Sequence, residues 1–227
     1  MSKKYIISVI PGDGIGKEVI PIALKVLNKL SIKFGFVFEF KLFKYSCDYY
    51  IRNGVMMDKD GLKKLEDCHA ILLGSVGMPS VADHISLWGL LIPIRRAFDQ
   101  YVNLRPVKSL KGIDSVLRDK KNIDYLIVRE NTEGEYSDIG GIENKNQPDE
   151  FVFQKAIFSK KGTERIVNYA YELAAKRKNK LTSATKSNGI IHSMTYWDNI
   201  VDSISKKYPN VTTSRYHIDI LSAQIIK

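Results

Sequence analysis

Hydrophobic and polar residues follow two patterns along this chain. Short apolar runs rich in branched or aromatic side chains predict buried strands, and apolar residues at helical spacing predict amphipathic helices. The runs typical of strands cover residues 5–10, 36–43, 70–73, 124–128, 181–184 and 211–220. The stretches typical of helices cover residues 15–30, 57–65, 166–174 and 190–204.

Strands that alternate with helices predict an α/β fold, because crossover connections produce a largely parallel sheet with helices on both faces. Pro93 disfavours helical geometry at Ile92 and suits a first helical turn, so we expect a helix to begin there, with Arg95 near its N-terminus. Residues 137–150 are polar and contain glycines, and residues 151–158 alternate between apolar and polar positions. This region predicts a loop followed by an extended arm.

Composition limits the class of protein. With 227 residues, 44% of them hydrophobic, the chain can bury a sizeable core. Its apolar runs are shorter than the roughly 20 residues that span a bilayer, and its N-terminus lacks the pattern of a signal peptide. Cys47 and Cys68 form no CxxC pair, which is typical of inert thiols in a reduced compartment. We therefore expect a soluble cytoplasmic protein without membrane contact.

The chain is basic, with a formal net charge of +10 and a pI near 9.4. Clustered positive charge is typical of nucleic-acid binding. Here the lysines occur in short pairs scattered along the sequence, and only residues 176–180 are locally dense. This pattern favours a solvated basic surface, so we expect no nucleic-acid partner.

A glycine-rich segment, residues 11–16, lies between the first expected strand and the first expected helix. Such turns can bind phosphate through backbone N–H groups at a helix N-terminus. The spacing matches neither standard motif, because Lys17 stands where GxGxxG requires glycine and Glu18 stands where the P-loop requires Ser or Thr. A tight strand-to-helix turn is favoured, and phosphate binding is the weaker alternative.

Three arginines are candidates for binding an acidic ligand. Arg129 directly follows the apolar run of residues 125–128, at the carboxyl end of an expected parallel strand, where open α/β sheets place their ligands. Arg95 and Arg105 also lie near expected element ends. Guanidinium groups bind carboxylates through two contacts, so a converging set suits a dicarboxylic acid. Each arginine alone is equally compatible with an ordinary surface charge.

Three further residues could carry proton or metal chemistry. Tyr136 and Lys186 lie in polar segments with glycines, where a tyrosine can donate a proton and a lysine can accept one. Both are also compatible with surface loops. Asp219 is a lone carboxylate in an expected strand, which is typical of a paired or metal-bound group. His217 lies on the same expected strand face, so an Asp and His pair is the simpler interpretation.

Several segments together resemble the isocitrate and isopropylmalate dehydrogenase family. They are IPGDGIGKEV, LLGSVGMP, DHISLWGLLIPIRRAFDQYVNLRPV, VRENTEGEYSDIGG, LTSATKSNGI and YHIDI, and they occur in family order along essentially the entire chain. Residues 83–100 make the chain most similar to the tartrate and D-malate dehydrogenase (decarboxylating) branch.

The resemblance implies an isopropylmalate dehydrogenase-like two-domain α/β fold, with parallel and mixed sheets flanked by helices. Residues 1–100 would form part of the first, cofactor-side domain, and residues 101–227 the second, substrate-binding and dimerisation domain, with an arm at about 137–158. The implied activity is oxidative decarboxylation of a small 2-hydroxy dicarboxylate with NAD and Mg²⁺ or Mn²⁺. The substrate would be D-malate, giving pyruvate and CO₂, or tartrate; isopropylmalate or isocitrate dehydrogenase activity is the alternative.

The resemblance also implies residue roles. The three arginines named above would hold the substrate carboxylates. Lys186 would take the hydroxyl proton with the help of water, and Tyr136 would protonate the enolate left by CO₂. Asp219 would ligate Mg²⁺ or Mn²⁺, and Asn188 would lie near the nicotinamide. In this family Lys186 and Asp219 reach into the partner's site, so a homodimer is implied.

The end of the chain departs from the family pattern. Relatives continue beyond the position of Lys227 with two further metal-binding aspartates and a loop that binds the adenosine part of NAD. We therefore expect the C-terminal part to be missing, the first domain to be incomplete and the isolated chain to be inactive. The alternative is a catalytically inactive remnant that serves as a non-catalytic dimerisation partner.

Overall fold

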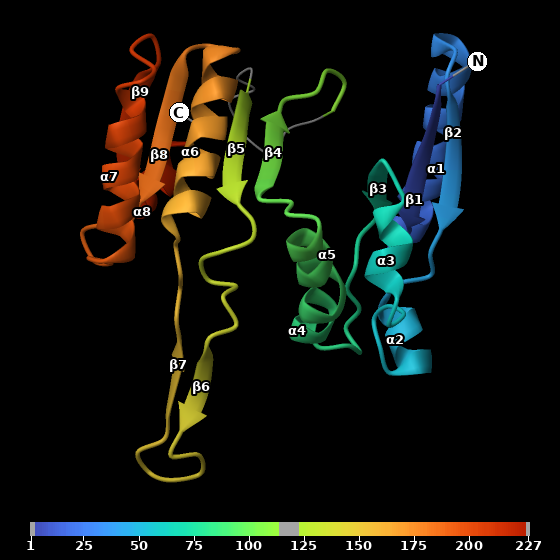
Figure 1. The fold of residues 1–227 in the computed structure, drawn as a ribbon, viewed down its shortest axis with the longest axis horizontal. Coiled ribbons are helices and arrows are strands. Elements are labelled where there is room, and N and C mark those ends of the chain that lie inside the picture. Colours follow the sequence, from blue (N-terminus) through green and yellow to red (C-terminus); the bar gives the residue numbers. More distant parts are fainter. Residues whose placement is uncertain (1–2, 114–122, 226–227) are drawn as a thin grey trace. The chain divides into compact units, whose positions relative to one another are not determined.

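The computed structural model describes residues 3–113 and 123–225. It divides into two compact units, residues 1–99 and residues 100–227 (Figure 1). Both units combine strands with helices, which confirms the predicted α/β fold. Across the described ranges, each helix is too short or too polar to cross a membrane.

The first unit is built on a three-stranded parallel sheet in the order β2-β1-β3. Its strands are β1 (Lys4–Ile10), β2 (Val37–Leu42) and β3 (Ala70–Leu73), and its helices include α1 (Gly16–Phe34), α2 (Cys47–Asn53) and α3 (Gly61–Glu66). Strand β1 is central, and its last residues Val9 and Ile10 are completely buried. β1, α1 and β2 therefore correspond to the strand, helix and strand that the apolar pattern predicted.

The glycine-rich turn after β1 is organised by a buried carboxylate. Asp13 is 1% exposed and accepts hydrogen bonds from the backbone N–H of Cys47 (2.9 Å), Asp48 (3.3 Å) and Gly77 (3.2 Å). Gly12 has φ +72°, and a Cβ there would lie 2.0 Å from the carbonyl oxygen of Ser75, so this approach requires glycine.

The first N–H groups of α1 are already used within the chain. The N–H of Gly16 donates to the Ser75 hydroxyl (2.9 Å), and that of Lys17 donates to the carbonyl of Gly14 (3.1 Å). Phosphate binding at a helix N-terminus depends on such groups being available. The geometry favours the tight-turn interpretation of residues 11–16.

The expected helix start at Pro93 is confirmed only in part: a helix, α5, begins at Ile92 with Pro93 in its first turn, but it continues an earlier helical stretch. A continuous helical stretch runs through α4 (Asp83–Ser86), the π-helical turn η1 (Leu87–Leu91) and α5 (Ile92–Ala97). Ile92 keeps helical angles (φ −65°, ψ −46°), and its N–H donates to Leu87, the bonding pattern of a π-turn. This turn lets the helix continue into the proline, which lacks an N–H. Arg95 consequently lies in the last turn and not near the N-terminus.

The described residues of the second unit form three strand pairs. Strands β4 (Val102–Lys108) and β5 (Asp124–Glu130) are antiparallel, as are β6 (Gly140–Glu143) and β7 (Phe151–Gln154), whereas β8 (Lys180–Thr185) and β9 (Thr212–His217) are parallel. Its helices are α6 (Lys160–Ala175), α7 (Ser193–Ser205) and α8 (Ile218–Gln224). Figure 1 shows the β6–β7 hairpin extending away from the rest of this unit.

Helices α6 and α7 bury the core of the second unit. Ile166 and Tyr171 of α6 and Val201 of α7 are at most 2% exposed and belong to one apolar cluster. The Tyr171 hydroxyl is hydrogen-bonded to Thr213 of β9 (2.8 Å), which satisfies its polar end. The strong amphipathic pattern of residues 166–174 thus predicted the main packing helix.

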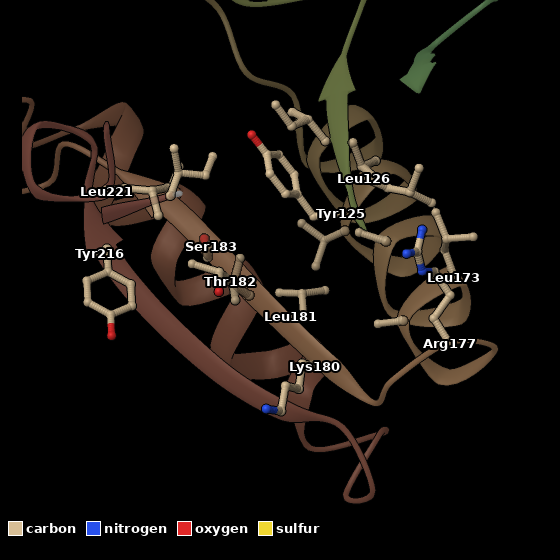
Figure 2. Close-up of a pocket in the computed structure, with 18 of the residues that line it drawn as sticks. Tyr125, Leu126, Leu173, Arg177, Lys180, Leu181, Thr182, Ser183, Tyr216 and Leu221 are labelled. Carbon is tan, nitrogen blue, oxygen red and sulfur yellow. The ribbon is translucent and has the colours of Figure 1, made fainter. Parts of the chain in front are cut away.

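An apolar groove of about 640 Å³ separates β5 from β8. Figure 2 shows the two strands on opposite sides of it, with Leu126 of β5, Leu173 of α6 and Leu181 of β8 among the lining side chains. Within the described part of the chain, β5 pairs with β4 and β8 pairs with β9, so their facing edges carry no strand partner. The groove is lined largely by apolar side chains and holds none of the predicted site residues.

Three further expectations are corrected. Arg129 does not follow a parallel strand; it is a residue of β5, whose pairing is antiparallel. The helix expected at residues 57–65 begins only at Gly61. Asp58, which precedes it, accepts hydrogen bonds from the hydroxyls of Tyr45 and Tyr49. The expected strand 211–220 ends at His217, and Asp219 lies in the first turn of α8, where negative charge is favourable.

Replacing Asp13 by Asn should destabilise the first unit. Burial raises the pKa of Asp13, but hydrogen bonds from the N–H groups of Cys47 and Gly77 lower it, and the net pKa lies below its ordinary value. Because the folded pKa is depressed, ionised Asp13 stabilises the fold at neutral pH, and this contribution is lost as the pH falls below about 4. We expect a loss of about 1–3 kcal/mol at pH 7.

Denaturant unfolding of the Asp13→Asn chain at pH 7 and pH 3 measures both effects. The difference from wild type should shrink at the lower pH. The control is Asp67→Asn, at an exposed position of the same unit. An equal loss of stability in both variants would contradict the role given to Asp13.

Candidate active site

Arg105 and Arg129 lie on the same face of the β4–β5 pair. In the register of these strands Arg105 is opposite Ile127, and Arg129 is two residues further along β5. Side chains two residues apart on a strand share a face, and such diagonal neighbours across a pair lie about 7–8 Å apart. Arg105 is exposed and Arg129 is half-buried. The pairing therefore gathers two positive charges at one place.

Tyr136 joins these charges through Arg129. The Arg129 guanidinium donates a hydrogen bond to the Tyr136 hydroxyl (3.0 Å), and its central carbon lies 5.4 Å from the centre of the Tyr136 ring. A phenol held this way accepts the hydrogen bond through its oxygen. Arg105, Arg129 and Tyr136 thus form one group that could bind a carboxylate and deliver a proton beside it.

Lys186 and Asp219 form a second group in the same unit. Lys186 follows β8, and its amine donates a hydrogen bond to the Asp219 carboxylate. This hydrogen bond, together with the positive charge, lowers the pKa of Asp219. The predicted Asp219 and His217 pair is therefore replaced by an ion pair with Lys186. A lysine beside a carboxylate can exchange protons with a ligand or with water.

Two predicted residues lie outside these groups. Asn188 is exposed in the turn that begins at Lys186, where the N–H of Gly189 donates to the Lys186 carbonyl (3.0 Å). Arg95 belongs to the first unit and is half-buried in α5. The second unit thus puts Arg105 on the strand face that carries Arg129, brings Tyr136 to Arg129, and brings Lys186 to Asp219.

Asp219 fits a divalent cation as a single ligand. It offers an ionised, exposed oxygen donor, which Mg²⁺ and Mn²⁺ prefer. Within the described residues, no cluster of three His, Cys, Asp or Glu side chains is close enough to hold a metal ion. A metal bound at Asp219 would need the other ligands from substrate, water or a second chain.

The residues of the turn after β5 were not predicted as part of the site. Glu130, Thr132 and Glu133 form hydrogen bonds with one another between Arg129 and Tyr136. The sequence carried a signal for this turn. Glu130 and Glu133 lie close together at the end of an expected strand, and carboxylates that become buried there need hydrogen-bond donors. Arg165, from α6, donates a hydrogen bond to the Thr132 hydroxyl (2.9 Å).

The sequence model of the isocitrate/isopropylmalate dehydrogenase family matches residues 6–227 of this chain. The chain belongs to the isocitrate/isopropylmalate dehydrogenase family. Among curated relatives of this family, a tartrate dehydrogenase/decarboxylase from Pseudomonas putida is 48% identical over 97% of the chain. A D-malate dehydrogenase [decarboxylating] from Escherichia coli is 48% identical over the whole chain.

The likeness extends to three dimensions. The crystal structure of isocitrate dehydrogenase from Methylococcus capsulatus superposes with a TM-score of 0.85 and 25% sequence identity, over 98% of this chain and 63% of that one. The chain spans 62% of the Pseudomonas putida protein and 64% of the Escherichia coli protein. It therefore corresponds to somewhat less than two thirds of these family members.

Replacing Lys186 by Met should raise the pKa of Asp219 towards its ordinary value, because the hydrogen bond from Lys186 is the largest cause of the lowered pKa. A carboxyl-detected NMR titration of the folded chain measures this value. Lys180→Met, at the other end of β8, is the control and should leave the titration of Asp219 unchanged. An Asp219 pKa that stays low in the Lys186 variant would exclude the ion pair.

Proposed function

We propose that this chain carries the substrate-binding and proton-transferring residues of an NAD-dependent enzyme that oxidises and decarboxylates a small 2-hydroxy dicarboxylate. D-malate, converted to pyruvate and CO₂, and tartrate are the proposed substrates. The observation that carries the proposal is the group formed by Arg105, Arg129 and Tyr136 on one face of β4 and β5. The names of the 48% identical relatives support the choice of substrates.

The arginines bind and orient the substrate. Arg129 is held by Tyr136 and by its strand, so its guanidinium has a fixed direction, and Arg105 adds a second charge on the same face. Two guanidinium groups match the planar oxygens of carboxylates through paired hydrogen bonds. Arg95 is proposed to complete the set from the first unit. This arrangement selects a doubly charged acid over a neutral alcohol.

Two residues move protons. Lys186, with water, takes the proton of the substrate hydroxyl as the hydride leaves the carbon that bears it. The departure of CO₂ leaves an enolate, and the Tyr136 hydroxyl gives its proton to the enolate carbon. If bound, NAD would supply the hydride acceptor, with Asn188 near its nicotinamide, and a Mg²⁺ or Mn²⁺ ion held by Asp219 would supply Lewis-acid stabilisation of negative charge.

The enzyme is proposed to act as a homodimer with shared sites. The β6–β7 hairpin exposes apolar side chains to water, including Phe151 (54%), Val152 (70%) and Ile142 (49%). Exposed apolar patches of this kind favour a contact with another protein surface. In such a dimer Lys186 and Asp219 of one protomer would serve the arginine group of its partner.

The test joins residues 1–227 to the part of the Escherichia coli D-malate dehydrogenase that follows the matched segment. With NAD and Mn²⁺, the purified fusion should form NADH and pyruvate from D-malate, or NADH from tartrate. Tyr136→Phe should lower kcat by about 10²–10⁴-fold, because it removes the proton donor. Arg129→Gln should mainly raise KM, and Arg52→Gln, at an exposed position of α2, is the control.

The outcomes separate the alternatives. A higher kcat/KM for isopropylmalate or isocitrate than for D-malate and tartrate would overturn the substrate assignment. A folded fusion without any dehydrogenase activity would favour a non-catalytic dimerisation partner. Full activity in Tyr136→Phe would remove Tyr136 from the mechanism.

A further inference from the structure

The segment between Arg129 and Tyr136 is a short stretch of bends and turns. Arg129 is in β5, and Tyr136 lies seven residues later, yet the two side chains are 3.0 Å apart at their hydrogen-bonding atoms. Glu130 follows Arg129 in the same strand, so its side chain points to the opposite face. A turn of defined shape is needed to return the phenol to the guanidinium.

The Glu130 carboxylate forms the centre of this turn. Its Oε2 accepts hydrogen bonds from the backbone N–H of Thr132 (2.9 Å) and Glu133 (2.7 Å). Its Oε1 accepts a hydrogen bond from the Thr132 hydroxyl (2.7 Å). The side chain is 7% exposed. A buried carboxylate that accepts three hydrogen bonds from its own turn fixes the backbone direction, because releasing any donor leaves charge unsatisfied.

Arg165 ties the turn to helix α6. Its guanidinium donates to the Thr132 hydroxyl (2.9 Å) and lies 3.9 Å from Glu130 Oε1. The central carbon of the same group lies 4.4 Å from the centre of the Tyr101 ring, which directly precedes β4. Thr132 therefore accepts from Arg165 and donates to Glu130, which links the helix, the turn and the start of the strand pair.

Neighbouring residues anchor both ends of the turn. Asn131, which is 8% exposed, donates its backbone N–H to Tyr101 (3.0 Å) and its amide to the Gln100 carbonyl (3.0 Å). Glu133 accepts from the backbone N–H (2.8 Å) and hydroxyl (2.6 Å) of Ser159, at the start of α6. A Cβ at Gly162 would lie 2.3 Å from Glu133, so the turn packs directly against the helix.

The charges in this region are divided between the two faces of β5. Arg165 pairs with Glu130 on one side, and Arg129 contacts the neutral phenol of Tyr136 on the other. Carboxylate pairing at Arg129 would weaken its attraction for an acidic ligand. The alternation of the strand directs the acidic side chain towards Arg165.

We propose that Glu130 and Arg165, acting through the Thr132 hydroxyl, are positioning residues that hold the Tyr136 hydroxyl against the Arg129 guanidinium. Neither residue needs to touch the substrate. The expected effect on the affinity for a dicarboxylate rests on the proposed function. The contact between Tyr136 and Arg129 depends on the turn alone.

The test compares two threonine hydroxyls in the full 227-residue chain. Thr132→Val removes the hydroxyl that connects Arg165 and Glu130, and Thr132→Ser restores it. Thr163→Val is the matched control, because the Thr163 hydroxyl is buried and has no hydrogen-bond partner within the described residues. Arg165→Met keeps an unbranched apolar stem and removes the guanidinium donor.

Two quantities are measured for each variant by NMR. The first is the nuclear Overhauser contact between the Tyr136 ring and the Arg129 side chain. The second is the apparent Kd for D-malate from chemical-shift titration. Thr132→Val and Arg165→Met should lose the contact and weaken D-malate binding about tenfold, the usual loss for a hydrogen bond to a charged group. Thr132→Ser and Thr163→Val should keep both within about twofold of wild type.

A folded Thr132→Val chain that keeps the contact and wild-type affinity would overturn the proposal. Loss of the contact in Thr163→Val to the same degree would also overturn it, because the effect would then be general loosening. If the wild-type chain does not bind D-malate, the proposed function fails, while the Tyr136 to Arg129 contact still decides the positioning role.

Discussion

The candidate site depends on one constraint: a buried carboxylate at the end of a strand must have donors, and the chain can provide them by folding around it. Glu130 meets this need with the N–H groups and hydroxyl that follow it. The shape that results places Tyr136 on Arg129. Asp13 applies the same constraint after β1, where the N–H groups of Cys47, Asp48 and Gly77 close around it. In both units a buried carboxylate fixes the backbone of the segment that follows a strand.

The pairing of the strands then determines which side chains lie together near each of these segments. The antiparallel register of β4 and β5 puts Arg105 and Arg129 on one face, and the alternation of β5 sends Glu130 to the other. The end of β8 brings Lys186 to Asp219 in the first turn of α8. The two groups of candidate site residues are thus carried by different strand pairs of one unit, which share α6 as a packing helix.

Local periodicity was sufficient to predict most elements. Residues 5–10 and 166–174 became β1 and part of α6 because their apolar faces found a core. The failures came from interactions that local pattern does not contain. Pro93 lies within a helical stretch because a π-turn precedes it, and α2 was missed although Ser46 caps it at the N–H of Tyr49. Sequence motifs named Arg129 and Tyr136, but their contact requires Glu130 and Arg165, which are far apart in sequence.

The groove between β5 and β8 has a consequence for handling the chain in solution. Two strand edges without partners in the described residues present rows of N–H and C=O groups beside apolar side chains. Such edges act as templates for extended segments of other molecules, and proteins normally shield them. Self-association through these edges therefore competes with correct refolding, and dilute conditions favour the folded chain over aggregates.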